Sequence, residues 1–461
     1  MANTSDYQPS INTFIIEDIK IFDGHKFIVN GFVIVRDGLI ADVGSGKPDK
    51  FIGQHILRIS RPQHTLIPGL IDAHIHALAG NTDSVEQSLR FGVTTVCDMH
   101  NEVQDIMRLK QLVGEPQNKT KYSDYKYAGI GAIIEGGWPI PVMKKELESV
   151  PQGEKILNVI VSGWPKLNTS HDAKPFVQQQ VNRHGASYIK MFHELGDTLG
   201  MKLPSPPIDV QNAVVKAAHE AGVIAVGHAL SYTGAMDLLE AGVDGFTHIF
   251  LDKPPNDHFI KTMKSRNVHC NPTLSLCASQ TAERQEWQQT FRRDPLAESM
   301  LIQKTPDKPL GLAKEERPRA GVQHAYETTR KLYRAGVPLI AGSDCAGQGF
   351  GVTYGLGIHI EMYLFAHEIG MSPEDVLKSA TSITAARFGF KDRGEISVGK
   401  KADLVLVKGD IVEVLSDPKN RCLPIAGVWR DGVLASVYER LHPEFVRVFV
   451  TDDSPCQDLI M

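Results

Sequence analysis

Residues 66–80 read LIPGLIDAHIHALAG, an apolar run that ends in two histidines separated by one residue. Side chains at positions i and i+2 of a strand point to the same face, so His74 and His76 are expected to project together. Two adjacent imidazoles at a strand end are suitable ligands for a divalent metal. An isolated His-x-His is more often a pair of core histidines, so the interpretation depends on the rest of the chain.

The middle of the chain alternates short apolar segments with amphipathic helical stretches. This alternation is typical of βα units that build a parallel sheet. Eight apolar segments can be counted from DAHIH to PLIAGSD, each next to a helical stretch. Eight such units close a (β/α)8 barrel, also called a TIM barrel. We therefore expect an α/β protein whose central domain, residues 68–392, is a (β/α)8 barrel.

The two ends of the chain have a different pattern. Residues 13–64 and 394–436 contain short runs rich in Ile and Val, cut by Asp-Gly and other turn residues. Such runs are typical of strands joined by hairpin turns. Because both ends share this pattern, we expect them to form one discontinuous domain, a small β-sandwich made of residues 1–67 and 393–461.

Two segments do not fit the barrel repeat. Residues 136–165, which contain GGWPIPVM and SGWP, are expected to form a long loop above the third strand. Residues 279–319 are charged and are expected to form a helical insertion after the seventh strand, with a role that the sequence leaves open. Loops that follow barrel strands surround the active face, so either segment could shape the pocket.

Composition argues against several functional classes. The 461 residues have a formal net charge of −5 and no long basic run, so nucleic acid is not an expected partner. The six cysteines lack paired spacing, as is typical of reduced thiols. Neither a signal peptide nor an apolar run of about 20 residues is visible. We expect a cytoplasmic homo-oligomer that binds a small-molecule substrate and no membrane.

Further ionisable residues fall on or at the ends of later strands. Lys190 lies in YIKMF, His228 ends VIAVGH, His248 ends DGFTH and Asp344 closes IAGSD. Active sites of such barrels lie at the carboxyl ends of the strands. Each residue has an ordinary explanation alone, for example a hydrogen-bonded core histidine or a paired buried lysine. Together with His-x-His, however, they indicate a metal centre.

These residues resemble the metal-dependent hydrolases of the amidohydrolase superfamily. The string PGLIDAHIH resembles the first barrel strand of that superfamily, and GVTTVCDM and GEISVGKKADLVLV also look like family strings. The branch that the chain resembles contains imidazolonepropionases, Xaa-Pro dipeptidase-like enzymes and N-acyl amino acid hydrolases. The resemblance implies a metal-ligand set on strands one, four, five, six and eight: His74, His76, Lys190, His228, His248 and Asp344.

The same resemblance implies the cofactor and the chemistry. Lys190 would be carboxylated and would bridge two divalent ions, for which Zn²⁺ is expected because imidazoles dominate, although Mn²⁺ or Co²⁺ would also fit. The expected reaction is cleavage of an amide bond in a small molecule, such as an N-acyl amino acid or a dipeptide. A metal-bridging hydroxide would attack, and Asp344 would be the catalytic residue that transfers the proton.

Other functions on the same scaffold are alternatives. One is a cyclic amide hydrolase or a deaminase of the imidazolonepropionase type, and another is a decarboxylase. Lys190 argues against a mononuclear deaminase, which lacks this lysine in the family. A non-catalytic assembly protein is the least favoured, because all six ligand positions are intact.

Two strings depart from the family pattern where substrate is usually held. After the third strand the chain reads Gly136, Gly137, Trp138, and the strand-four lysine is followed by FHE at 192–194. We therefore take Trp138, His193 and Tyr232 as candidate substrate contacts. For each of them, ordinary packing is the alternative.

Overall fold

The computed structural model describes residues 12–48, 56–281, 285–302, 318–347 and 351–445. Parts of two predicted features lie outside the described residues. These parts are residues 1–11, 49–55 and 446–461 of the predicted terminal domain, and residues 282–284 and 303–317 of the predicted insertion. None of the helices in the described ranges is both long and apolar enough to cross a membrane.

The centre of the molecule contains two parallel sheets. Their strands are short and mostly buried along their whole length, as expected when helices cover both faces. One sheet contains β6 (Leu70–Ile75), β7 (Val93–Asp98) and β8 (Asp124–Tyr127). The other contains β9 (Ile189–Phe192), β10 (Ala225–His228), β11 (Gly245–Phe246) and β12 (His269–Cys270).

Isolated bridges connect the edges of these sheets. Ala132 pairs with Met191 between the sheets. The prediction of a regular eighth strand is wrong, because residues 338–345 are irregular in the structure. This segment nevertheless lies between the remaining two edges, where its Leu339 and Cys345 form parallel bridges with β12 and β6. The chain thus has a TIM-barrel-type fold without one continuous sheet.

Helices surround these strands, and α12 (Val322–Ala335) shows why they form. Its buried residues recur at helical spacing, and it ends before Gly336, whose φ of 71° suits a helix C-terminus. The other helices of the barrel region are α1 (Asp83–Arg90), α2 (Val103–Gly114), α5 (Ala173–Gln178), α6 (Ile208–Glu220), α7 (Tyr232–Ala241), α8 (Asp257–Ser265), α9 (Leu274–Gln280), α10 (Gln285–Arg292), α11 (Pro295–Met300), α13 (Leu356–Leu364), α14 (Pro373–Ser379) and α15 (Ser382–Arg387).

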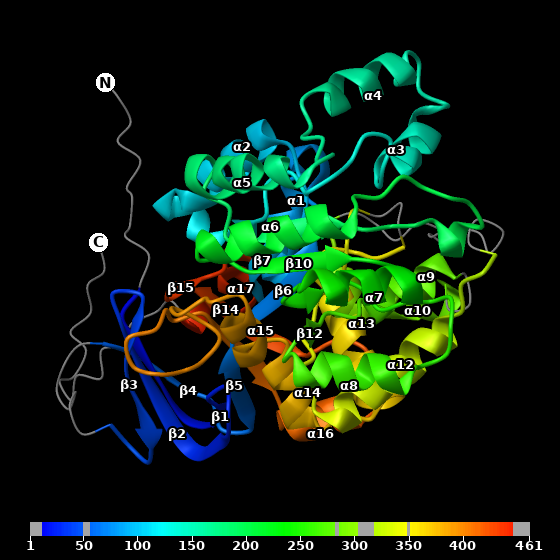
Figure 1. The fold of residues 1–461 in the computed structure, drawn as a ribbon. Helices are drawn as coiled ribbons and strands as arrows, with labels where there is room; N and C mark the ends of the chain where they lie inside the picture. Colours follow the sequence, from blue (N-terminus) through cyan, green and yellow to red (C-terminus); the bar gives the residue numbers. More distant parts are fainter. Residues whose placement is uncertain (1–11, 49–55, 282–284, 303–317, 348–350, 446–461) are drawn as a thin grey trace, which may run out of the picture.

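Both ends of the chain contribute to one eight-stranded sheet in the order β15-β14-β13-β5-β1-β2-β3, with β4 paired to β1. The prediction that the two ends associate is confirmed, whereas the structure has a single mixed sheet where a sandwich of two sheets was expected. In Figure 1 the blue strands of the first 68 residues are part of this sheet. The strands are β1 (Phe14–Phe22), β2 (Phe27–Arg36), β3 (Leu39–Ser45), β4 (Leu57–Ser60), β5 (His64–Pro68), β13 (Leu404–Lys408), β14 (Ile425–Arg430) and β15 (Val433–Leu434). The helix α16 (Ile411–Ser416) lies between β13 and β14, and α17 (Ser436–Leu441) follows β15.

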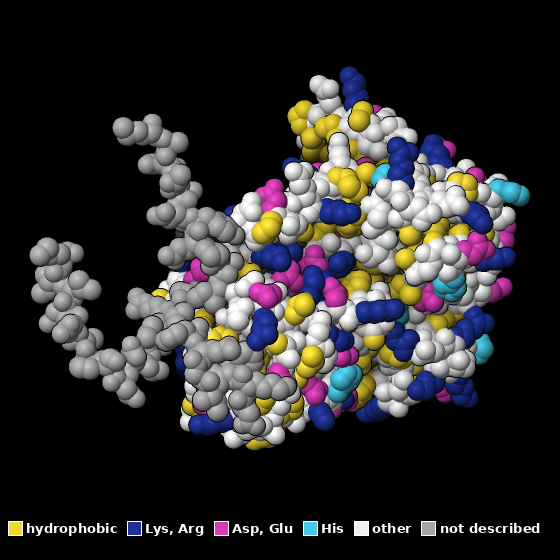
Figure 2. Space-filling view, turned by 90° about the vertical axis from the view of Figure 1, so that its left-hand side faces the viewer, with side chains coloured by type: hydrophobic (Ala, Val, Ile, Leu, Met, Phe, Trp, Pro, Cys, Tyr) yellow, Lys and Arg dark blue, Asp and Glu magenta, His cyan; other side chains and the backbone are white. Residues whose placement is uncertain are grey.

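The segment predicted as a loop, 136–165, is mostly helical. It forms a hairpin of α3 (Ile140–Leu147) and α4 (Gly153–Ser162) that projects from the top of the molecule (Figure 1). Figure 2 shows hydrophobic side chains on this projecting part. Val159 is 76% exposed there, while other residues of the hairpin face the barrel. Pro and Gly residues lie at the ends of these two short helices, and because such residues are typical of loops, the sequence pattern predicted a loop.

Arg393 joins the barrel to the segment that leads into β13. Its side chain is buried, with Nη1 2.6 Å from Asp124 Oδ2 and donating to Thr95 Oγ1 at 2.6 Å. Its Nε donates to Asp392 Oδ1 at 2.9 Å. Burial would raise the pKa of Asp124, but Arg393 and its neighbours hold it far below its usual range. The ion pair therefore connects β7 and β8 with the C-terminal part of the chain.

Replacing Arg393 should destabilise the protein strongly. Arg393→Met keeps much of the side-chain volume but leaves the half-buried Asp124 carboxylate without its main partner, and loss of one partner of a largely buried pair typically removes about 3–5 kcal/mol. Chemical denaturation should show this as a lower midpoint. Lys391→Met, at an exposed site two residues away, should stay within about 0.5 kcal/mol of the parent. Equal midpoints for the two variants would contradict the assigned role.

Candidate active site

His74 and His76 come from the carboxyl end of the first barrel strand. Every residue of β6 is buried, and His76 follows directly after it. The two Nε2 atoms lie 3.3 Å apart. The prediction that the two imidazoles project to the same side is therefore confirmed.

Asp72 holds this strand against the irregular segment 338–345. Its carboxylate accepts hydrogen bonds from Ser343 N at 2.9 Å, from Ser343 Oγ at 2.6 Å and from His74 N at 3.1 Å. The next residue, Asp344, donates from its backbone nitrogen to His74 O at 2.7 Å. Burial raises the pKa of Asp72 to about 7 against the effect of these donors. Asp72 therefore positions the site, because its oxygens are occupied by donors.

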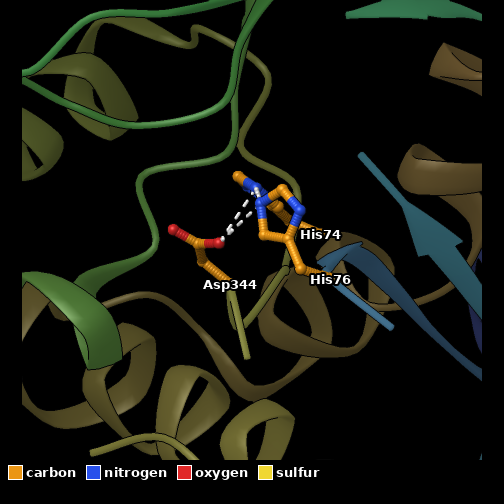
Figure 3. A group of neighbouring side chains, drawn as sticks. All are labelled: His74, His76 and Asp344. Carbon is orange, nitrogen blue, oxygen red and sulfur yellow. Dashed lines mark hydrogen bonds and ion pairs between the residues drawn. The ribbon is translucent and has the colours of Figure 1, made fainter. Parts of the chain in front are cut away.

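Asp344 completes a compact group with the two histidines. Its Oδ1 lies 3.1 Å from His74 Nε2 and 3.3 Å from His76 Nε2 (Figure 3). Within the described residues, these three form the one His/Cys/Asp/Glu group whose ligand atoms all lie within 4.8 Å of one another. Asp344 has a φ of 51°, which is uncommon for a residue other than glycine and is often found at functional sites.

His248 and His228 continue the group along the carboxyl ends of the second sheet. His248 Nε2 lies 3.5 Å from Asp344 Oδ2, and its ring centroid is 5.1 Å from that of His74. The ring of His228 lies 4.6 Å from that of His248. His228 Nε2 is also 3.4 Å from Glu194 Oε2. The structure thus brings four histidines and one aspartate into one chain of neighbours.

Lys190 lies on β9 and is 1% exposed. Its Nζ donates to Thr247 Oγ1 at 2.5 Å, and among the described residues no carboxylate forms an ion pair with it. Burial lowers the pKa of Lys190 to about 7, with a partial opposing effect from Asp344. A buried lysine without a counter-ion is uncommon, and it indicates a chemical role for this amine.

The donor set fits a divalent metal. Burial lowers the pKa of His74 to about 3 and also lowers those of His228 and His248, which keeps these imidazoles in the neutral form that binds metals. Burial would raise the pKa of Asp344, but His74 and His248 hold it well below its usual range. The buried His74 Nδ1 also has no hydrogen-bond partner among the described residues. Neutral imidazoles beside an ionised carboxylate are typical zinc ligands.

A cavity of about 450 Å³ opens onto this group. Its volume lies in the range of small-molecule sites. His76, His228, His248 and Asp344 are among its lining residues. Much of the remaining lining comes from the segment of the α3–α4 hairpin: Trp138, Pro139, Val142, Met143, Ile160 and Trp164.

The structure places one of the three candidate substrate contacts in the cavity. Trp138 lines it and stacks on His228 at 5.5 Å between ring centroids. His193 is not among the lining residues, and its ring nitrogens are bonded to Asp237 at 3.0 Å and Ser205 at 2.8 Å. Tyr232 also lies outside the lining and packs edge-to-face against Phe250.

Several site residues were missed in the sequence. His100, two residues beyond β7, lines the cavity and accepts a hydrogen bond at Nδ1 from Gly131 N at 3.0 Å. Trp164 lies edge-on to His100 at 4.7 Å between ring centroids. Glu194, the last residue of the FHE string, is buried two residues beyond β9 and was not among the candidate contacts. His100 could have been found by the rule that active residues follow barrel strands.

Known proteins resemble this chain along most of its length. It is 23% identical over 393 residues to an imidazolonepropionase of Pyrobaculum arsenaticum, covering 81% of this chain and 85% of that protein. The structure of a Xaa-Pro dipeptidase with bound methionine has a TM-score of 0.67 at 22% identity, covering 92% of this chain and 99% of that one. The structure of molinate hydrolase has a TM-score of 0.72 at 18% identity, covering 98% and 99%.

These solved structures share the fold at low sequence identity. The family assignment rests on the sequence itself, in which the amidohydrolase family profile matches residues 65–438, and this range includes all six predicted ligands. The chain therefore belongs to the amidohydrolase family and is a hydrolase that acts on carbon–nitrogen bonds.

Proposed function

We propose that this protein is a binuclear metal-dependent hydrolase that cleaves an amide bond of a small molecule. The observation that supports it most is that Lys190, a buried lysine with no carboxylate ion pair among the described residues, is close enough to interact electrostatically with Asp344, which groups with His74 and His76. The proposed ligand set is the one implied by the sequence: His74, His76, Lys190, His228, His248 and Asp344.

Lys190 would contribute as a carbamate. Its lowered pKa, about 7, leaves a substantial fraction of the amine neutral near pH 7, and the neutral amine is the form that adds to carbon dioxide. The addition forms an N–C bond and releases one proton, which converts a buried cation into an anion. Two carboxylate oxygens on a long stem would then serve as a bridging ligand, and the desolvation penalty of a buried ammonium would be removed.

Two bound divalent ions, with Zn²⁺ as the proposed species, would lower the pKa of water and polarise the scissile carbonyl. Asp344 is ionised and faces His74, His76 and His248, so its carboxylate can accept a proton from the attacking water. It would pass that proton to the leaving nitrogen, so that amide and water become a carboxylic acid and an amine. The substrate would occupy the 450 Å³ cavity beside this group. We propose a cytoplasmic homo-oligomer as the working form.

A cyclic amide is a second candidate substrate. The similarity to an imidazolonepropionase over 85% of that protein's length favours it. The same residues would open a ring amide by the same proton transfer. A panel of linear N-acyl amines, N-acyl amino acids, dipeptides and cyclic amides, assayed with metal-reconstituted protein, distinguishes the two candidates.

Metal removal and reloading test the binuclear proposal. Chelated protein reloaded with Zn²⁺ should contain about two ions per chain, and turnover of the best amide of the panel should rise with loading. Elemental analysis of each activity sample measures this. Full activity with less than one ion per chain would overturn the binuclear proposal.

Asp344→Asn should separate metal binding from proton transfer. The amide side chain keeps an oxygen but no longer acts as a base, so the protein should keep much of its metal while kcat falls by about 10²–10⁴-fold. Asp209→Asn, at an exposed site on α6, is the matched control and should leave both quantities unchanged. A near-normal kcat for Asp344→Asn would rule out the proposed base.

Lys190 variants test the carbamate. Lys190→Ala should lose the metal pair, with a loss of affinity exceeding the 10–100-fold typical of outer-shell changes, and added acetate or propionate should restore part of the activity because it can enter the space left by the side chain. Lys190→Met fills that space, so the same acids should not restore activity. A Lys190→Met protein with two ions and a normal rate would exclude the carbamate.

A further inference from the structure

The cavity beside the predicted ligands has mainly apolar walls. Beyond the histidines and Asp344, large hydrophobic side chains line it from several elements. Trp138 and Trp164 lie at the two ends of the hairpin segment, and Phe192 lines the cavity from the end of β9. The remaining apolar lining residues are Leu78, Ala79, Pro139, Val142, Met143, Ile160, Leu276 and Ala346.

The charged groups of the described lining all have one sign. Glu102 and Asp105 line the cavity in addition to Asp344, and no Lys or Arg is among the described lining residues. Glu102 accepts a hydrogen bond from the Trp164 indole at 2.6 Å. The nearby Arg108 guanidinium does not line the cavity, and it donates to Asp105 and to the backbone oxygen of Ala79.

The other polar groups of the lining are neutral. Asn101, Gln104 and Gln280 contribute side-chain amides. His100 accepts a hydrogen bond at Nδ1 from Gly131 N, so Nδ1 carries no proton and the ring is neutral with its proton on Nε2. Such groups can bind the carbonyl or N–H of an uncharged amide, but they do not compensate the charge of a carboxylate.

This lining restricts the groups that the remote end of an amide substrate can carry. A carboxylate far from the metals would lose its hydration against apolar walls and would face Glu102 without a cation, which is strongly unfavourable. An aromatic or other bulky apolar group would instead gain from leaving water and from contact with the indole rings. The lining therefore favours substrates without an acid group at the end remote from the metals.

We infer that the substrate of this site is an uncharged amide with a bulky apolar group, most simply an aryl group, held between the α3–α4 hairpin and Phe192. Amides whose apolar end carries a carboxylate, remote from the scissile bond, are poor substrates. This inference rests on the proposed amide hydrolysis and specifies the part of the substrate that is not cleaved.

A matched pair of compounds tests it. N-Benzoyl-2-phenylethylamine and N-benzoyl-2-(4-carboxyphenyl)ethylamine have the same rings and the same scissile amide, and they differ in one carboxylate at the end remote from that amide. For the metal-loaded full-length protein, calorimetry should give a dissociation constant at least about tenfold lower for the uncharged compound, and kcat/KM should differ in the same direction. Equal or tighter binding of the acid would overturn the inference.

A substitution in the hairpin locates the effect. Met143→Lys places a cation in the wall and should reduce the preference for the uncharged compound by about tenfold, while Met143→Leu, its apolar control, should keep the parental ratio. An unchanged ratio in a folded Met143→Lys protein, with metal content equal to the parent, would overturn the placement of the apolar group against the hairpin.

Binding and cleavage separate this inference from the proposed function. Tighter binding of the uncharged compound without any cleavage at full metal loading would support the assigned pocket chemistry and count against amide hydrolysis. Cleavage of both compounds with equal kcat/KM would support amide hydrolysis and overturn the substrate class.

Discussion

The contact between Asp72 and Ser343 is the constraint on which the site depends. The segment 338–345 stands where an eighth strand is expected, but it lacks a regular ladder of backbone hydrogen bonds. The Asp72 carboxylate replaces part of that ladder by accepting two bonds from Ser343, and it also accepts one from the backbone of His74. One buried side chain thereby fixes the distance between a ligand of the first strand and Asp344. Gly342 allows the close approach, since a Cβ there would lie 2.9 Å from His74 N.

Much of this arrangement could be predicted from local sequence patterns. The period of two in a strand placed His74 and His76 on one side, and the alternation of apolar and helical segments indicated parallel strands with residues of interest at their ends. His228 ends β10 as expected. The similar turn-rich patterns of both chain ends indicated that they associate, and they share one sheet. These features depend on short stretches of chain, so the sequence contains enough information to predict them.

The features that could not be predicted depend on contacts between distant residues. His193 looked like a substrate contact, but Asp237 and Ser205 occupy its two ring nitrogens. Tyr232 packs against Phe250 outside the cavity. The aromatic segment 136–165 was predicted as a loop, because Pro and Gly residues lie at the ends of its two short helices. Whether a polar side chain is available or already paired is decided by tertiary packing, which no local pattern reports.

The pairing of β5 with β13 has a consequence for synthesis of the chain. β5 pairs with β1 on one side and with β13 on the other, and more than 300 residues separate it from β13. At about 5–20 residues per second, a ribosome needs roughly 15–70 s to make that stretch. During this interval the apolar edge of β5 has no β13 to pair with, and an unpaired edge of this kind can pair with a strand of another chain. The nascent N-terminal strands therefore keep an unpaired edge until β13 has been synthesised.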